Sequence, residues 1–469
     1  MSPGRAVVVG GGIAGLVAAY ELFERGLDVT LFESDSRFGG KIVTSRTDDG
    51  LVIEGGADSF LSSKPAGLAL CQRLGIGSRL INSRPDDRRT FVWSRGRLRT
   101  LPEGLVLGSP ARVGGLLRSG LISPAGAARM ALDVAVPARR DGVEESIGGF
   151  FTRRLGREAY DRVVEPLLAG IHAGDATKLS LPALFPRFVA MERDHGGLVR
   201  AALAARRNHD GPAPTEAAGH SPFVSLQGGM GELIEALVAI LSSTGATLQS
   251  GTRVTDLAPT DAGWRVGVEG GEPVEADAVI MATPAFVTAG LVRSLSPPAT
   301  ALLEGIPHAS TATVSLAYRA GDVGGRAPAG YGFVVPRVEA RPLIAATWSS
   351  NKWPSRVIPG HHVIVRGYVG GVGREGVMSR PDDELVTLVR SELEALAGLT
   401  GEPLHTEVHR YPQGMPQYTV GHLERVARIR AELASWPGLA VTGAAYGGVG
   451  IPDCITDATA TAAAIAATL

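Results

Sequence analysis

The 469-residue chain has few cysteines, few lysines and no long hydrophobic run, and each scarcity excludes a class of protein. Its two cysteines, Cys71 and Cys454, are too few for a disulfide framework or a four-cysteine metal site. No uninterrupted apolar stretch approaches the ~20 residues that a membrane-spanning helix requires. The N-terminus also lacks the layout of a signal peptide. We therefore expect a cytoplasmic protein with no membrane span.

Charge of one sign is not in excess either. Lys and Arg total 46, Asp and Glu total 47, and the net charge is −1, so the chain lacks the basic footprint of a nucleic-acid-binding protein. Only four of the basic residues are lysines (Lys41, Lys64, Lys178 and Lys352), which leaves few candidates for a lysine-dependent mechanism. Hydrophobic residues make up 44% and charged residues 20% of the chain, as is typical of folded domains.

Glycine, in contrast, is abundant, and the first glycine cluster forms a motif. The apolar run 6–9 is typical of a buried parallel strand, and it is followed at once by Gly10-Gly11-Gly12-Ile13-Ala14-Gly15, which reads G-x-G-x-x-G. A helical pattern comes next, and a second strand at 28–32 ends at Glu33. This order of strand, glycine turn, helix, strand and acid predicts a dinucleotide-binding site.

Each part of the motif has a physical role in such a site. Gly10 permits the tight turn, Gly12 lets a pyrophosphate approach the backbone, and Gly15 lets the helix pack close to the strand. The helix N-terminus offers free N–H groups and the positive end of its dipole to the phosphates. Glu33 can accept hydrogen bonds from both hydroxyls of an adenosine ribose. The alternative is a glycine-rich turn that binds nothing.

The residues that follow indicate which dinucleotide is bound. Glu33-Ser34-Asp35-Ser36-Arg37-Phe38-Gly39-Gly40-Lys41 resembles the E-x-x-x-R-x-G-G-[RK] signature of the flavin-containing amine oxidase superfamily, whose members bind FAD. The resemblance implies that the glycine pair lies against FAD and that Lys41 reaches phosphate or ribose oxygens. It also implies that a second glycine turn, Gly55-Gly56-Ala57-Asp58-Ser59, lies beside the isoalloxazine.

A third glycine cluster lies near the C-terminus. Residues 439–442 read as a buried strand that runs into Gly443, and Gly450-Ile451-Pro452-Asp453 opens an alanine-rich helix. In the resembled superfamily this segment stabilises reduced flavin, for which helix N–H groups are suited. The alternative is that this strand–turn–helix segment completes the sheet and has no role in cofactor binding. The resemblance also places the backbone of Val254 against the adenine.

A cofactor site made from both ends of the chain predicts an α/β fold with a discontinuous, Rossmann-like FAD-binding domain. An α+β substrate domain and a mainly helical subdomain would be inserted into it. We expect FAD-binding segments at 1–85, 223–290 and 411–469. The helical, substrate-entrance region is expected at 86–222 and the substrate-binding domain at 291–410.

Further motifs resemble the porphyrinogen oxidases of haem biosynthesis in particular. They lie at Glu165–Ser180, Trp348–Pro354, Pro416–His422 and Gly450–Cys454, while residues 101–108 resemble the soluble branch found in Gram-positive bacteria. The resemblance implies an FAD-dependent, six-electron oxidation of coproporphyrinogen III to coproporphyrin III, with three O2 reduced to three H2O2. Protoporphyrinogen IX is the alternative substrate.

The resemblance also suggests a catalytic candidate and partners. Lys64 matches an active-site candidate of the soluble branch, but it could equally be a surface residue at the start of the helix that Pro65 opens. Thr90 stands where the membrane-associated branch has an arginine for a substrate propionate. Ferrochelatase and a haem-pathway decarboxylase would act downstream as partners.

Other classes of function remain open. Amine oxidases commonly place a lysine near the flavin after the strand that ends in A-T-P, whereas residues 283–319 contain none. A carotenoid desaturase would need no propionate anchors, and a flavin-free binding protein on the same fold is the alternative outside enzymes. His405 and His409 lie in a strand-like alternation that separates them, so we predict no metal site.

Overall fold

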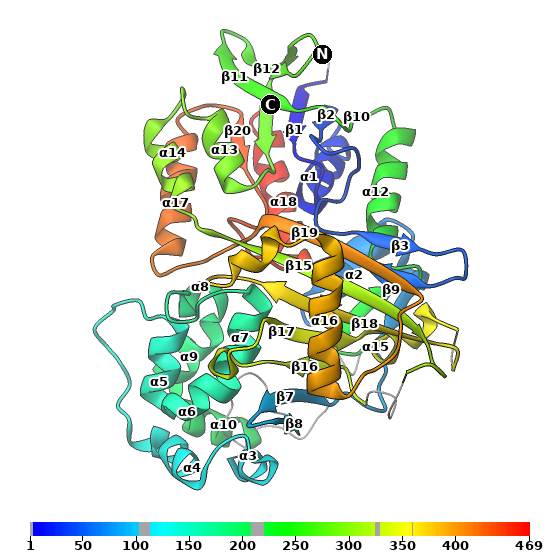
Figure 1. Ribbon diagram of the computed structural model, residues 1–469. Coiled ribbons are helices and arrows are strands. Elements are labelled where there is room, and N and C mark those ends of the chain that lie inside the picture. Colours follow the sequence, from blue (N-terminus) through cyan, green and yellow to red (C-terminus); the bar gives the residue numbers. More distant parts are fainter. Residues whose placement is uncertain (1–2, 103–112, 208–219, 324–328, 359) are drawn as a thin grey trace.

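The computed structural model describes residues 3–102, 113–207, 220–323, 329–358 and 360–469. Figure 1 shows an upper lobe that carries both ends of the chain and a lower lobe built on a second large sheet, with a group of helices beside it. Residues 103–108, which carry most of the soluble-branch motif, lie outside the described residues.

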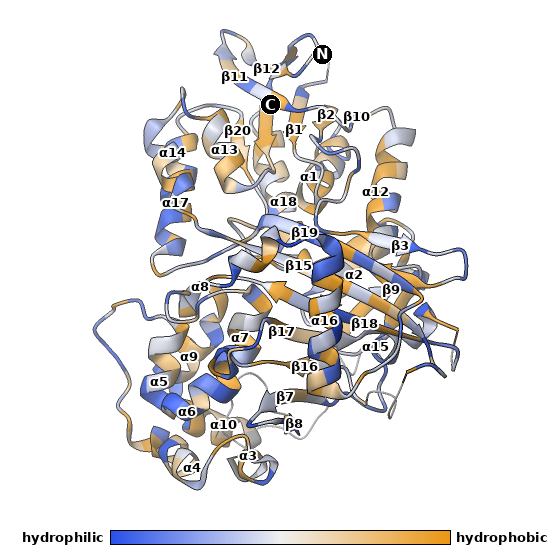
Figure 2. Cartoon of the chain, viewed as in Figure 1, coloured by the Kyte–Doolittle hydropathy of each residue, from blue (hydrophilic) through white to orange (hydrophobic). Residues whose placement is uncertain are grey.

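A five-stranded parallel sheet forms the centre of the upper lobe, in the order β10-β2-β1-β14-β20. Its strands are β1 (Arg5–Val9), β2 (Asp28–Phe32), β10 (Thr247–Gln249), β14 (Ala278–Met281) and β20 (Leu439–Val441). The strands come from the beginning, middle and end of the chain. The central strands β1 and β14 are hydrophobic along most of their length, as burial on both faces requires, and Figure 2 shows this for β1. The edge strand β10 is largely exposed.

The two faces of this sheet pack into different cores. Ala6 and Val8 of β1 point into one core, and Val7 and Val9 point into the other, because successive side chains alternate along a strand. The first core contains α1 (Ile13–Phe23), α2 (Pro65–Arg73), α12 (Gly231–Ser243) and α18 (Ile451–Ala466). The second contains α13 (Ala285–Leu291), α14 (Pro297–Glu304), α17 (His422–Leu433) and the small sheet of β11 (Val254–Thr260), β12 (Gly263–Val268) and β13 (Val274–Ala276).

The second large sheet has seven strands in the order β19-β15-β18-β17-β16-β7-β8. Its strands are β7 (Thr90–Ser94), β8 (Arg97–Thr100), β15 (His308–Arg319), β16 (Gly332–Val334), β17 (Leu343–Trp348), β18 (His362–Gly370) and β19 (His405–Pro416). Helix α16 (Asp382–Ala397) packs on one face. Gly367 allows this close packing, because a Cβ there would lie 2.5 Å from a methyl group of Val389.

Short helices connect the strands of this sheet, and a helical group packs beside it. The connecting helices are η5 (Arg337–Glu339), α15 (Ser349–Lys352), η6 (Pro354–Arg356) and η7 (Glu375–Ser379). The helical group comprises α3 (Val113–Ser119), α4 (Pro124–Ala131), η3 (Leu132–Ala135), α5 (Ile147–Leu155), α6 (Arg157–Ala159), η4 (Tyr160–Val164), α7 (Glu165–His172), α8 (Leu181–Leu184), α9 (Pro186–His195) and α10 (Leu198–Arg207). A buried ion pair of 2.8 Å between Arg154 and Asp133 lies within it.

Two small sheets connect the lobes. One pairs β3 (Thr44–Arg46) with β4 (Val52–Glu54), and the other contains β5 (Phe60–Leu61), β9 (Phe223–Leu226) and β6 (Leu80–Asn82), which follows η1 (Gly77–Arg79). Within the described part of the chain, no helix combines the length and the apolar composition needed to cross a bilayer. The predicted α/β fold class is confirmed, while the exact domain boundaries remain a prediction.

Candidate functional site

The carboxyl edge of the parallel sheet brings together the glycine clusters from the two ends of the chain. Gly10 follows β1 and Gly443 follows β20, two strands away in the sheet. A Cβ on Gly443 would lie 3.6 Å from the Cβ of Ala14 in the first turn of α1. Open α/β sheets bind their ligands outside this edge, so the geometry marks a candidate site where the sequence predicts one.

The three motif glycines differ in their surroundings. Gly10 has a φ of +107°, in the region that favours glycine. A Cβ on Gly15 would lie 1.8 Å from the carbonyl oxygen of Gly10, so no side chain fits between helix and strand. Gly12 has an ordinary φ of −70°, and a Cβ there would meet nothing within 4 Å. Open space therefore lies in front of Gly12, where a ligand could approach the backbone.

The first turn of α1 presents backbone N–H groups to this space. Gly12 is its N-cap, and no side chain caps the helix. The N–H groups of Ile13, Ala14 and Gly15 have no acceptor within the helix because they belong to its first turn. With the positive end of the helix dipole, these donors suit a pyrophosphate.

Glu33 lies beside this turn at the end of β2. Its Oε2 accepts a hydrogen bond from the N–H of Gly11 at 2.6 Å, and its Oε1 accepts one from the N–H of Asp35 at 2.7 Å. The Ser34 hydroxyl also donates to Oε1, at 3.2 Å. The backbone N–H of Thr252 donates to the Glu33 carbonyl at 2.8 Å, which brings the start of β11, and so Val254, close to Glu33.

Gly39, Gly40 and Lys41 lie across from the glycine turn. Gly39 and Gly40 have φ values of +106° and +55°, and the N–H of Gly39 donates to the Gly11 carbonyl at 2.8 Å. Lys41 donates from Nζ to the carbonyl of Gly414 at 2.6 Å. Its side chain is exposed, yet desolvation lowers its pKa.

At the C-terminal side, Lys64 and Asp453 form an ion pair. Lys64 Nζ lies 2.6 Å from both carboxylate oxygens of Asp453, in the first turn of α18. Gly450 is the N-cap of α18, and no side chain caps the helix. The first turn therefore presents the N–H groups of Ile451 and Asp453 without a side-chain cap, while Pro452 between them has no N–H. The structure thus joins two residues that the sequence predicts at the site for different reasons.

Tyr418 fixes the loop between Gly443 and Gly450. Its hydroxyl donates to the carbonyl of Ala444 at 2.6 Å and accepts from the N–H of Gly448 at 2.9 Å. Its ring stacks on His422 with 3.8 Å between ring centroids. The sequence includes both residues in a family-like motif but assigns them no role.

The second glycine turn packs tightly against its neighbours. A Cβ on Gly56 would lie 1.8 Å from the carbonyl oxygen of Lys41, and one on Gly55 would lie 2.6 Å from the ring of His409. Thr313 of β15 donates to the Gly55 carbonyl at 2.6 Å. Ala57 packs against the first core of the upper lobe. The turn therefore joins the parallel sheet to the seven-stranded sheet.

Asp58, in this turn, belongs to a cluster of buried charges that the sequence does not reveal. Lys352 Nζ lies 3.2 Å from its Oδ1, and Arg366 lies 3.3 Å from its Oδ2. Burial alone would raise the pKa of Asp58, but Lys352 and Arg366 reverse this effect and hold that pKa far below its ordinary value. Ser59 donates to Oδ1 at 2.7 Å.

Two further residues complete this buried charge cluster. Arg356 forms a 2.9 Å ion pair with Glu54, and both side chains are almost fully buried. Arg366 donates to the carbonyls of Glu54, at 3.0 Å, and Gly56, at 2.7 Å. Three cations thus surround two carboxylates, so positive charge is in excess beside the glycine turn. Lys352 lies in the predicted motif Trp348–Pro354, and the scarcity of lysine was the signal that could have singled it out.

These surroundings fit a dinucleotide cofactor. The open approach to Gly12, the two uncapped helices and the carboxylate of Glu33 match a pyrophosphate and a ribose. In the part of the chain that the structure describes, no group of three or more His, Cys, Asp or Glu residues is arranged to hold a metal ion.

Comparisons with known proteins agree with this geometry. Residues 13–466 match the family model described as flavin containing amine oxidoreductase. The chain is 36% identical to the coproporphyrinogen III oxidase of Bacillus subtilis (strain 168), with 97% of each chain covered. It is 38% identical to the coproporphyrinogen III oxidase of Propionibacterium freudenreichii subsp. freudenreichii, with 96% of this chain and 89% of the relative covered. A crystal structure from Exiguobacterium sp. 255-15, provisionally named protoporphyrinogen oxidase, matches with a TM-score of 0.88 and 32% identity over 100% of both chains.

Proposed function

The chain belongs to the flavin containing amine oxidoreductase family, and we propose that it is an FAD-dependent oxidase that converts coproporphyrinogen III to coproporphyrin III. The observation that carries this proposal is the nearly full-length match to relatives named coproporphyrinogen III oxidase, at 36% and 38% identity. The family membership supports an oxidoreductase with a flavin, and the relatives' names supply the substrate.

Residues of all three glycine clusters would hold FAD. Gly10, Gly11, Gly12, Ile13, Ala14 and Gly15 would bind the pyrophosphate, Glu33 and Ser34 the adenosine ribose, and Val254 the adenine. Gly39, Gly40 and Lys41 would lie along the phosphates. The isoalloxazine would lie between Gly56, Ala57, Asp58 and Ser59 on one side and Gly443, Gly450, Ile451, Pro452 and Asp453 on the other. FAD would supply the hydride acceptor and pass electrons to O2.

The chain's own charges support an oxidation of this kind. The buried charge cluster has one cation more than it has carboxylates, and Arg366 donates directly to the carbonyl of Gly56. Excess positive charge in a desolvated place favours the negative charge that reduction adds to a nearby cofactor. Lys64 would act by holding Asp453 at the N-terminus of α18, although the sequence suggests Lys64 as a catalytic candidate.

We also infer the organisation of the chain and its partners. Residues 1–85, 223–290 and 411–469 would form the FAD-binding domain, 86–222 the substrate-entrance region and 291–410 the substrate domain. Three O2 would give three H2O2 for each porphyrin formed. Ferrochelatase and a haem-pathway decarboxylase would use the product downstream in the cytoplasm.

Protoporphyrinogen IX is the second candidate substrate. The name of the Exiguobacterium structure, which matches this chain over its full length, supports it. The two porphyrinogens undergo the same ring oxidation and differ in their side groups. The choice between them depends on the substrate cavity and leaves the flavin site unchanged.

The first experiment identifies the cofactor and its reductant. Flavin released from purified protein by heat is identified by mass, and the flavin-loaded protein is then mixed with coproporphyrinogen III without oxygen. We expect FAD, and we expect the visible flavin absorbance to bleach with coproporphyrinogen III but not with putrescine. FAD-loaded protein that bleaches with putrescine and not with coproporphyrinogen III would overturn the proposal in favour of an amine oxidase.

A further inference from the structure

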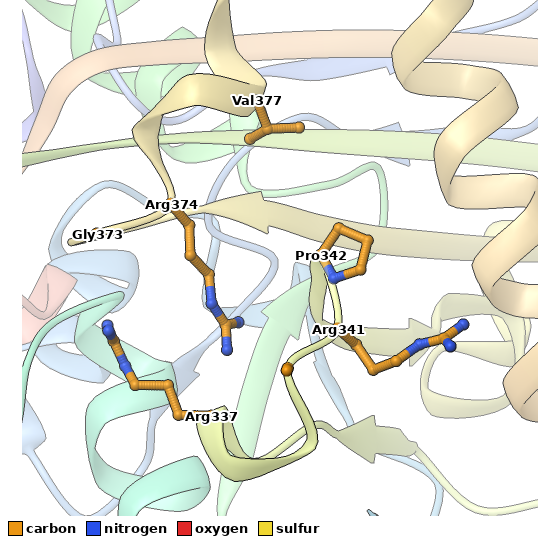
Figure 3. Close-up of a pocket in the computed structure, with 7 residues that line it drawn as sticks. Arg337, Arg341, Pro342, Gly373, Arg374 and Val377 are labelled. Carbon is orange, nitrogen blue, oxygen red and sulfur yellow. The ribbon is translucent and has the colours of Figure 1, made fainter.

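An arginine-lined cavity of about 400 Å³ lies where η5 approaches the segment that follows β18. Arg337, Arg341 and Arg374 contribute to its wall together with Pro342, Gly373 and Val377 (Figure 3). Its volume lies in the range of small-molecule sites in proteins. Neither the glycine clusters nor the buried charge cluster contributes a residue to it.

The cavity lies on the side of the seven-stranded sheet that α16 covers. Arg341 forms two hydrogen bonds, of 2.9 and 2.7 Å, with Glu392 of α16. Val377 packs against the core beneath α16. Arg366, in contrast, lies in β18 one residue before Gly367, which contacts α16, so its side chain points to the opposite face and reaches Asp58 there. The cavity is therefore separate from the candidate flavin site.

The three arginines differ in the hydrogen bonds and ion pairs that other residues of the protein form with their guanidinium groups. Arg341 is held by Glu392. Arg337 donates to the carbonyls of Val372, at 2.7 Å, and Gly174, at 3.3 Å, and lies 3.6 Å from Glu165. The backbone N–H of Arg374 donates to the Gly371 carbonyl at 2.9 Å. Its guanidinium, in contrast, has no hydrogen bond or ion pair with any residue that the structure describes, although Arg374 is partly buried.

The positive charge of Arg374 is only partly compensated by neighbouring negative charge. Desolvation lowers the pKa of Arg374, the neighbouring charge of Arg337 lowers it further, and Glu165 opposes both effects. Figure 3 shows the side chain of Arg374 extending downward and that of Arg337 extending upward from opposite sides of the cavity that both residues line, while the side chain of Arg341 extends away from both. A planar guanidinium with free N–H groups matches carboxylate and phosphate oxygens in a two-point contact.

We propose that this cavity binds a small oxyanion, a phosphate or a carboxylate, between Arg337 and Arg374. Arg374 supplies the unpaired guanidinium. Arg337 adds a second positive charge while its position is fixed by the backbone carbonyls. This binding site adds to the proposed oxidase function and does not depend on it.

The test is calorimetric titration of the flavin-loaded protein at constant ionic strength, with inorganic phosphate in one series and succinate in the other. Sodium chloride alone is the blank. We expect one saturable site, and Arg374→Gln should weaken binding at least about tenfold, because a hydrogen bond to a charged group is lost. Tighter binding of phosphate would identify a phosphoryl ligand, and tighter binding of succinate a carboxylate ligand.

Arg253→Gln is the matched control. Arg253 is exposed and pairs at 3.6 Å with exposed Glu269, at the hairpin of β11 and β12, so its loss should leave binding unchanged. Arg374→Gln should also retain flavin, melting temperature and the rate of porphyrinogen oxidation. Heat effects no larger than the chloride blank, or equal affinity in Arg374→Gln and the unaltered protein, would overturn the proposal whatever the oxidase assay gives.

Discussion

Gly12 and Gly15 share one motif but are glycines for different reasons. A side chain at Gly15 would collide with the backbone of Gly10, so this glycine is required by the fold itself. A side chain at Gly12 would meet no protein atom within 4 Å, and its φ of −70° suits any residue. Only a ligand in the open space would explain a requirement for glycine at position 12.

Gly12→Ala therefore separates cofactor binding from folding. We expect the variant to fold with an unchanged melting temperature of the cofactor-free protein and to lose most of its bound FAD, because the added methyl group occupies the approach to the backbone. The measurement is flavin content per polypeptide after purification. Gly290→Ala, at an exposed position of α13 with equally open space, is the control and should keep its flavin. Full FAD content in Gly12→Ala would show that the pyrophosphate lies elsewhere.

Buried histidines make the stability of the protein sensitive to acid. Desolvation, with a contribution from Arg425, lowers the pKa of His422 from an ordinary 6.5 to about 4. Between pH 6.5 and about pH 4, His422 is protonated in the unfolded chain but stays neutral in the folded chain. The stability that His422 contributes above pH 6.5 is therefore lost progressively as the pH falls to about 4. One such group accounts for a loss of up to about 3 kcal/mol.

His422→Phe tests this effect because phenylalanine keeps the stacking on Tyr418 but cannot be protonated. We expect the fall in unfolding free energy between pH 7 and pH 4 to shrink by up to about 3 kcal/mol, measured by urea denaturation. His195→Gln, at an exposed position, should keep the full acid sensitivity. The same slope in His422→Phe as in the unaltered protein would contradict the assignment.

At the scale of elements, buried ion pairs attach the glycine turns to the seven-stranded sheet. Glu54 ends β4, and Arg356 ends η6, which follows β17 and α15 in the chain. Burial raises the pKa of Glu54, and Arg356 opposes this effect. Removing one member of a buried pair leaves the other charge without compensation, which costs more than removing both.

Arg356→Met should therefore destabilise the protein by about 3–5 kcal/mol, while the double variant Arg356→Met with Glu54→Gln should recover part of that loss. Denaturant unfolding of the two single variants and the double variant measures the coupling. A double variant at least as unstable as the sum of the single variants would show that the pair contributes no coupling energy across these elements.

The sequence predicts sites formed by residues close together in the chain better than sites formed by contacts between segments far apart in the chain. The strand, glycine turn, helix and Glu33 follow one another within the first 33 residues, so spacing alone predicts their arrangement. Lys352 and Asp58 are 294 positions apart, and nothing in the pattern around either residue shows that the chain folds one onto the other. The sequence does not predict the arginine-lined cavity for the same reason, because Arg337 lies in the connection between β16 and β17 and Arg374 lies in the segment after β18.

At the scale of the whole molecule, the discontinuous parallel sheet explains why both ends of the chain contribute to one site. β1 and β20 lie on either side of β14, so their carboxyl ends open toward the same space. The seven-stranded sheet is attached below this space by the turn Gly55–Ser59 and the buried charge cluster. A substrate oxidised by a flavin in this space would be bounded by that sheet. The predicted family is confirmed by the match over residues 13–466, whereas the roles of individual site residues remain predictions.

The most direct test of the proposed function is the initial rate of porphyrin fluorescence in air, with coproporphyrinogen III and protoporphyrinogen IX measured side by side against blanks without enzyme. We expect the FAD-loaded protein to oxidise both substrates, with the higher rate for coproporphyrinogen III. A higher rate with protoporphyrinogen IX would reverse the choice of substrate and retain the flavin chemistry. No rate above the blank with either substrate, from protein that carries its flavin, would contradict the central claim.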